Sequence, residues 1–180
     1  MKPVFPLLFG ALLLSCGAPS AHDSADTPPV ESTTMAIASP NALDLSQFDM
    51  PLLVNVAETG TPPVAIMNEE MGRVEVRAGD HFGIAITEMG PDFARLKADL
   101  ERDMLLKNTI VQETPELLLY RSEYPDGAGT FMHFMQVVKS GLPAAQAGAR
   151  TFVVEDLPDG RFNESDAKAM MGAVTAKPAS

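Results

Sequence analysis

The chain has 180 residues, a length that favours a single domain. It carries 13 basic and 24 acidic side chains, for a formal net charge of −11, and this balance argues against a nucleic-acid partner because phosphate binding needs clustered Lys and Arg. A single Cys excludes an intramolecular disulfide or a zinc ribbon, and the apolar share of 46% is ordinary for a globular protein.

The beginning of the chain has the pattern of an export signal. Lys2 is followed by the uncharged run VFPLLFGALLL, which is too short to cross a bilayer as a helix. The run ends in LLSC, with an aliphatic residue three positions before Cys16 and a small residue directly before it. This pattern resembles the lipobox of bacterial lipoproteins, in which the cysteine becomes the first mature residue and carries the lipid. We therefore predict that residues 1–15 are a lipoprotein signal peptide and that Cys16 is lipidated.

The lipobox resemblance implies attachment to the bacterial cell envelope. Each buried lipid CH₂ contributes about 0.8 kcal/mol, and stable anchoring takes more than one chain. The several acyl chains of a lipoprotein cysteine, palmitate among them, would therefore hold Cys16 in the membrane. Gly17 stands where the inner-membrane retention signal of enterobacteria has Asp, so we expect the outer membrane, with its periplasmic and surface sides both left open.

A polar segment follows the cysteine. Residues 17–41 are rich in Ala, Ser, Thr, Pro and Asp, with no aromatic residue and no apolar periodicity. Such a composition buries too little apolar surface to offset the entropy of ordering. We predict a lipidated cysteine and flexible tether over residues 16–43, with a random-coil reach on the order of 25–30 Å, and a single folded domain over residues 44–180.

Apolar alternation between turn signals predicts a series of short strands in this domain. They are expected over residues 52–56, 64–67, 73–78 and 81–88, and then over 109–114, 116–123, 130–139 and 150–155. Turn dipeptides such as Gly79-Asp80 and the Pro-Asp-Gly run at 125–127 join them as hairpins.

Two helices are expected between and after these strands. Gly90-Pro91-Asp92 opens the first with Pro at the first helical position, and an apolar stripe of Phe93, Leu96, Leu100 and Met104 runs along it until Asn108. The second begins with Asn163 as its N-cap and Asp166 three residues later, with Phe162 placed to pack on Ala167 and with Val174 on its buried side.

The predicted order is β-β-β-α-β-β-β-β-α, give or take a strand. Hairpins dominate it, so we expect an α+β fold in which an antiparallel sheet carries both helices on one face. The segments FMHFMQVVK, ARTFVVED and RFNESDAKAMMGAV, within residues 52–174, resemble PsbP-like and DcrB-like domains. That resemblance implies a binding or assembly role rather than catalysis, and it carries over no site residue.

The Met-rich strand offers one candidate metal site. On a strand His133 and Met135 share a face, and Met and His clusters bind copper in oxidising compartments. A further ligand would have to come from elsewhere, and His81 is the other His in the domain. The favoured alternative is that the methionines fill an irregular core and His133 faces solvent.

An acidic stretch offers a second candidate, for calcium, which takes six to eight oxygen ligands. The residues are Glu155, Asp156, Asp159, Asn163, Glu164 and Asp166. Their spacing does not match an EF-hand loop, and turn formation and helix capping account for them without a cation.

Sequence motifs of catalysis are missing. There is no G-x-S-x-G, H-E-x-x-H, P-loop or G-x-G-x-x-G run, and the lone Cys is assigned to the lipid, so neither an enzyme nor a cofactor is expected.

Tyr120, Arg121 and Tyr124 form a candidate binding rim, because Tyr and Arg are enriched at interfaces. The alternative is that Tyr120 packs at a sheet edge and Arg121 offsets neighbouring acids.

These observations together predict a lipid-anchored envelope protein with a non-catalytic binding or assembly role, acting on another envelope protein. The alternative is an envelope lipoprotein that binds a metal ion or a small ligand on its sheet face.

Overall fold

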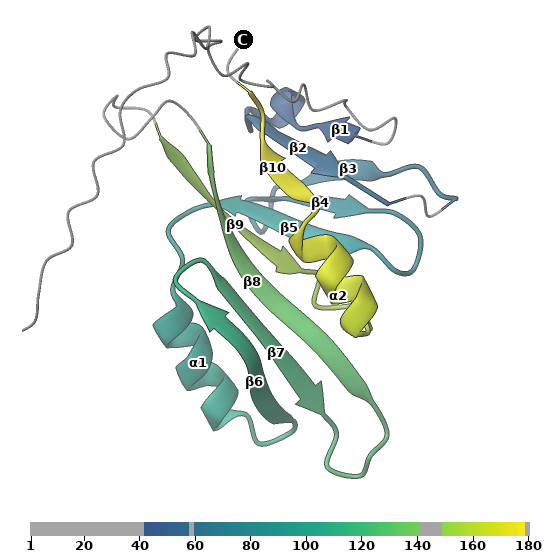
Figure 1. Cartoon of the computed structure of the whole chain (residues 1–180), viewed down its shortest axis with the longest axis vertical. Helices are drawn as coiled ribbons and strands as arrows, with labels where there is room; N and C mark the ends of the chain where they lie inside the picture. The colour runs from purple at the N-terminus through teal and green to yellow at the C-terminus, as the bar shows by residue number, and fades with distance from the viewer. Residues whose placement is uncertain (1–41, 58–59, 141–148, 179–180) are drawn as a thin grey trace, which may run out of the picture. The chain divides into compact units, whose positions relative to one another are not determined.

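The computed structural model describes residues 42–57, 60–140 and 149–178 (Figure 1). Within these ranges, ten strands form two antiparallel sheets accompanied by two α-helices, which confirms the α+β class with more sheet than helix. The predicted signal peptide, Cys16 and residues 17–41 of the predicted tether lie outside the described residues. No helix in the described ranges is long and apolar enough to cross a bilayer.

The larger sheet has seven strands in the order β3-β4-β5-β9-β8-β7-β6, with every neighbouring pair antiparallel. The strands are β3 (Val64–Asn68), β4 (Arg73–Arg77), β5 (Gly83–Glu88), β6 (Lys107–Thr114), β7 (Leu117–Glu123), β8 (Thr130–Ser140) and β9 (Arg150–Asp156). Two groups of three consecutive strands, β3-β4-β5 and β6-β7-β8, meet on either side of β9. Strand β9, the last strand of this sheet along the chain, therefore joins its two halves.

The smaller sheet has the order β1-β2-β10, formed by β1 (Ala42–Asp44), β2 (Leu52–Asn55) and β10 (Val174–Ala176). A 3-10 turn (Ser46–Phe48) lies between β1 and β2. The first described strand thus begins two residues before the predicted boundary at Asp44. Val174, predicted to lie on the final helix, instead begins β10 and pairs with Val54 of β2. Its strand conformation depends on a partner far away in the sequence.

The helices are α1 (Phe93–Arg102) and α2 (Glu164–Met171). The capping of α2 is confirmed. The Asn163 side chain accepts from the backbone N–H of Asp166, and the Asp166 carboxylate accepts from the backbone N–H of Asn163. Helix α1 differs from the prediction at both ends. Pro91 was predicted at the first helical position, but the helix begins at Phe93 and Asp92 is its N-cap. The helix stops before Asp103, whose carboxylate accepts from the backbone N–H groups of Leu105 and Leu106 as the chain turns toward β6.

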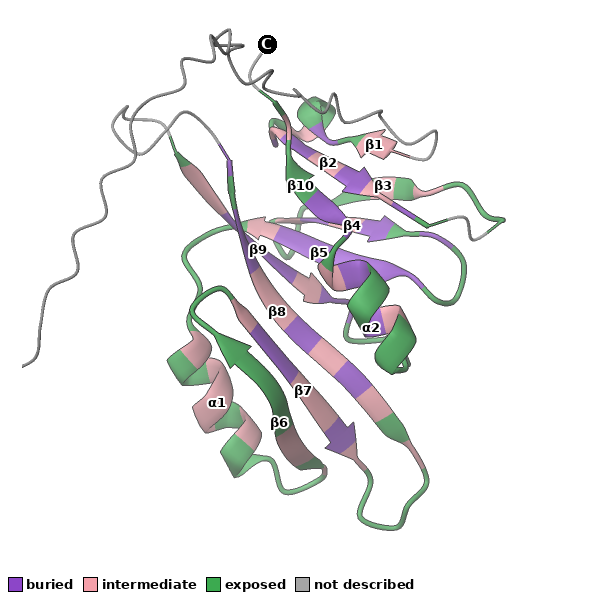
Figure 2. Cartoon of the chain, in the orientation of Figure 1, coloured by how far each residue is buried: buried purple, intermediate pink, exposed green. Residues whose placement is uncertain are grey.

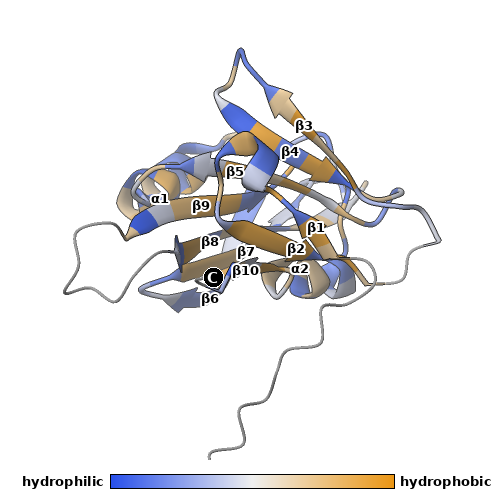
Figure 3. Ribbon diagram, turned by 90° about the horizontal axis from the view of Figure 1, so that it is seen from above, coloured by the Kyte–Doolittle hydropathy of each residue, from blue (hydrophilic) through white to orange (hydrophobic). Residues whose placement is uncertain are grey.

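The two helices lie on opposite faces of the larger sheet, so the prediction that both pack on one face was wrong. Alternate residues of β8, among them Phe134, join the main core together with Met170 of α2. The residues between them face the other way, toward Leu96 of α1. Figure 3 shows α1 and α2 on either side of the β8–β9 pair.

Both faces are covered because the central strands are apolar on both. Phe134, Val154 and Leu119 are buried on the α2 face, and Leu118, Val137 and Val153 are buried on the α1 face. Figure 2 shows buried residues along β7, β8 and β9, whereas no residue of α1 is fully buried. A strand that is apolar on both sides needs a layer on each. Helix α1 is thus a partly exposed cover over one face.

Candidate functional site

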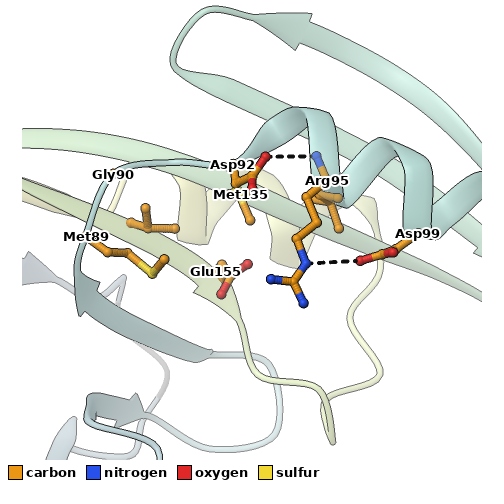
Figure 4. Close-up of a pocket in the computed structure, with 9 residues that line it drawn as sticks. Met89, Gly90, Asp92, Arg95, Asp99, Met135 and Glu155 are labelled. Atoms are coloured by element: carbon orange, nitrogen blue, oxygen red, sulfur yellow. Dashed lines mark hydrogen bonds and ion pairs between the residues drawn. The ribbon is translucent and has the colours of Figure 1, made fainter.

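Two adjoining cavities lie between α1 and the sheet, and we call them together the α1 groove. The first has a volume of about 290 Å³ and is shown in Figure 4. The second, of about 270 Å³, lies toward the start of β8 and the end of β9, and Tyr120 and His133 line it. Leu96 of α1 and Glu155 of β9 line both cavities. These two residues therefore mark the middle of the groove.

Strand register places the floor of the groove. Met135 of β8 lies directly opposite Glu155 of β9, and Tyr120 of β7 lies opposite His133. Because side chains two residues apart share a face of a sheet, Val153 joins Glu155 on the floor of the first cavity. The roof comes from α1 and from Met89, at the end of the strand that leads into the helix.

Glu155 has an unusual setting for a carboxylate. It is half-buried, and none of the described residues donates a hydrogen bond or an ion pair to it. Burial raises the pKa of this carboxyl, the nearby charge of Asp156 raises it further, and Arg73 acts weakly in the opposite direction. In Figure 4 its oxygens lie on the cavity floor, with Met89 on one side and the Arg95 guanidinium on the other.

The polar groups on the roof are engaged with one another. The Asp92 carboxylate accepts from the backbone N–H of Arg95 at 2.9 Å, as a helix N-cap does. The Arg95 side chain lies 3.8 Å from Asp99, which also lies 3.5 Å from Arg102. These three side chains are exposed, so their ion pairs stabilise the fold little.

A second set of polar side chains, Asp156, His133 and Tyr120, lines the other end of the groove. The Asp156 carboxylate accepts from the backbone N–H of Phe134 at 2.7 Å and lies 2.7 Å from Nδ1 of His133. The Tyr120 ring stacks on the His133 ring, with 5.1 Å between the centroids. Burial raises the pKa of the Tyr120 hydroxyl, and the charges of Asp156 and then Glu155 add to the shift. Asp156 therefore fixes the orientation of the imidazole ring against the tyrosine.

The predicted metal site is not formed. His133 and Met135 do share the sheet face that the alternation predicted, but they line different cavities of the groove. His81 lines neither cavity and lies instead 3.3 Å from Asp166 of α2. In the described part of the chain, no three His, Cys, Asp or Glu side chains are grouped so as to hold a metal ion.

The predicted binding rim is also not formed. Tyr120 faces the α1 groove, and Arg121 points to the opposite face, because adjacent strand residues alternate. The Arg121 Nε atom lies 3.2 Å from Glu123 without the geometry of a hydrogen bond. Tyr124 is in the following turn, edge-on to Phe131. The three side chains thus share no surface.

The acidic stretch is used partly by local structure, as the alternative to a calcium site proposed, and partly by contacts with residues far away in the sequence. Asp159 pairs with Arg77, Glu164 pairs with Lys168, and Asp166 belongs to the helix cap. Glu155 stands apart from them because it enters the groove. The sequence signal for this role is a carboxylate at an inward-facing position of the apolar run FVVED.

No family model, curated protein or solved structure matches the chain. The likeness to PsbP-like and DcrB-like domains and the lipobox assignment therefore stay predictions made from the sequence.

Proposed function

We propose that this chain is a lipid-anchored protein of the bacterial cell envelope, placed at the outer membrane, whose folded domain binds a small ligand without converting it. The observation that carries ligand binding is the α1 groove. Its cavities of about 290 and 270 Å³ adjoin at Leu96 and Glu155, and sites for small molecules have volumes from about 300 Å³ upward. The LLSC sequence at Cys16 supports the anchor.

The lining of the groove favours binding over nucleophilic catalysis. Apolar side chains of Met89, Leu96, Met135 and Val153 lie around a few convergent polar groups, as in most ligand sites. The described lining residues include no Ser, Thr, Cys or Lys beside the His133–Asp156 pair, so that pair has no such nucleophile to activate. We assign the pair a positioning role for the Tyr120 and His133 rings.

Methionine methyl NMR tests whether the groove accepts a ligand. The protein is residues 16–180 with Cys16→Ala and ¹³C-labelled methionine methyls, and the probe is 2-phenylethanol, a small neutral amphiphile. We expect the signals of Met89 and Met135 to shift on titration, while Met67 and Met104, outside the groove, stay in place. Leu96→Trp should abolish the shifts by filling both cavities.

The matched control is Leu105→Trp, which adds the same bulk on an exposed loop. It should leave the shifts of Met89 and Met135 unchanged. Unmoved signals in the parent protein, or equal shifts in both Trp variants, would rule out ligand binding in the α1 groove.

A protein partner is a second candidate, favoured by the exposed edge of the larger sheet. Strand β3 is at the end of the described strand order, and Val64 and Ile66 on it are 55% and 61% exposed. Apolar edge strands are templates for a strand from another chain. Crosslinking in the native host should recover an envelope protein that Ile66→Lys loses and Met104→Lys retains. Equal recovery with both variants would exclude β3 as the docking edge.

A further inference from the structure

We propose that the α1 groove selects an organic cation, a protonated amine on an apolar body, and that Glu155 is the counter-ion of that amine. The inference rests on the proposed function, because it assumes that the groove binds a small ligand. It adds the chemical class of that ligand and the residue that recognises it.

Glu155 is the acidic group of the groove whose carboxylate has no hydrogen-bond or ion-pair partner among the described residues. The other three carboxylates of the lining each have partners: Asp92 caps α1, Asp99 lies beside Arg95 and Arg102, and Asp156 accepts from Phe134 and contacts His133. No described residue donates to the carboxylate of Glu155. Removing a carboxylate from water without a partner is costly. A ligand ammonium at the junction of the two cavities would offset that cost.

The two arginines of the lining are not free to neutralise Glu155. The Arg73 guanidinium is held by Glu75, with N–O distances of 2.7 and 2.9 Å. The Arg95 side chain is largely exposed and lies nearer to Asp99 on its own helix. With four carboxylates and two arginines on its walls, the groove attracts cations and repels anions.

The surroundings of Glu155 suit the apolar body of such a ligand. Met89, Leu96, Met135 and Val153 form an apolar wall within reach of the same carboxylate. Thioether side chains are polarizable and adapt their shape to a ligand. In the second cavity, the Tyr120 ring, which stacks on His133, also lines the wall, and an aromatic ring attracts a cation. Both cavities that meet at Glu155 therefore favour the same ligand class.

The test compares three probes of nearly the same shape and different charge: phenethylamine, 2-phenylethanol and 3-phenylpropanoate. Binding is followed in the same protein through the methyl signals of Met89 and Met135. We expect the amine to bind about tenfold more tightly than the alcohol, since hydrogen bonds to charged groups are the strong ones. The carboxylate probe should bind most weakly.

Three variants assign the preference to Glu155. Glu155→Gln keeps the side-chain shape and should weaken amine binding to the level of the alcohol, a loss of about tenfold. Glu116→Gln removes the same charge from an exposed position outside the groove and should leave the preference unchanged. Arg95→Gln should maintain or strengthen amine binding, because it removes a competing cation from the roof.

The outcomes separate the two proposals. If the alcohol binds as tightly as the amine, or if Glu155→Gln leaves amine binding unchanged, the groove remains a ligand site but the selection of a cation is wrong. A loss of amine binding in Arg95→Gln would equally overturn the inference. If no probe moves the Met89 and Met135 signals, the proposed function fails as well.

Discussion

At the scale of single residues, Asp156 has the greatest structural role in the groove. Its side chain is 5% exposed and satisfies both the Phe134 N–H and the His133 ring. Asp156→Ala leaves these two groups without an acceptor, and we expect the free energy of unfolding to fall by about 2–4 kcal/mol. Urea denaturation measures the change.

The matched control is Asp159→Ala, three residues along the chain. Asp159 pairs with Arg77 at the surface, so its loss should change the free energy of unfolding by about 1 kcal/mol or less. Equal losses in the two variants would mean that the Asp156 contacts do not stabilise the fold.

The ionised Glu155 carboxylate, unlike that of Asp156, lowers the stability of the folded state. The charged and titratable groups that line the cavities with it are Asp156, Arg73, Arg95, Asp92, Asp99, His133 and Tyr120. Its pKa is raised in the folded protein, chiefly by burial, so the charged form opposes folding above that pKa. When the pH falls below both the folded and the unfolded pKa, the carboxyl is protonated in both states and this penalty disappears.

Glu155→Gln should therefore raise the melting temperature at neutral pH, and the gain should vanish below about pH 4. Thermal unfolding followed by circular dichroism across this range measures it. Glu116→Gln serves as the surface control and should show no comparable gain. A gain in Glu155→Gln that is the same at both ends of the range would contradict the linkage argument.

At the scale of secondary-structure elements, α1 and α2 differ in how firmly they are held. No residue of α1 is buried, whereas Ala167 and Met170 of α2 are fully buried in the main core. Local opening free energies follow the number of buried apolar contacts. We expect the amides of α1 to exchange with solvent at least tenfold faster than those of β8 and β9, on which it lies. Hydrogen exchange followed by mass spectrometry measures this.

A ligand in the groove should slow the exchange of α1, because it would add contacts on the underside of the helix. The amides of α2, on the other face of the sheet, are the internal control and should not change. Protection of α1 as strong as that of β9 in the free protein would contradict this description of the helix as a loosely held cover.

Elements determined by local interactions could be predicted from the sequence, and those determined by distant partners could not. The capping box at Asn163 is contained within four residues and predicts the start of α2. Strand β10 exists because Val174 pairs with Val54, and no pattern within three residues reveals that partner. The end of α1 was misplaced because Asp103 forms a side-chain turn that overrides the apolar periodicity through Met104.

The groove was only partly predictable for the same reason. Period-two alternation places His133 and Met135 on one face of their strand. The arrival of Leu96 above Glu155 depends on where α1 crosses the sheet, which the alternation does not contain. The apolar run FMHFMQVV carries a further signal that the predicted placement of both helices on one face does not reflect. A strand that is apolar at successive positions is buried on both faces, which implies covering layers on opposite sides.

At the scale of the whole molecule, the proposed anchor and the proposed ligand site lie in different parts of the chain. The predicted lipid at Cys16 supplies the membrane attachment, and the first strand of the folded region begins at Ala42. The net charge of −11 disfavours contact with anionic head groups. Under the proposed function, the described domain presents the α1 groove to its ligand, and the anchor takes no part in the groove.

Cys16→Ala tests this division. Once its signal segment is removed, the variant should leave the membrane fraction of the native host, because a chain without the lipid then keeps no other predicted attachment. Ser15→Ala is the control: it preserves a small residue before the cysteine, so lipidation and membrane fractionation should persist. If Cys16→Ala still sediments with membranes after its signal segment is removed, attachment must come from the folded domain. The exposed apolar side chains of β3 and of the loop at Met104 would then be the surfaces to mutate.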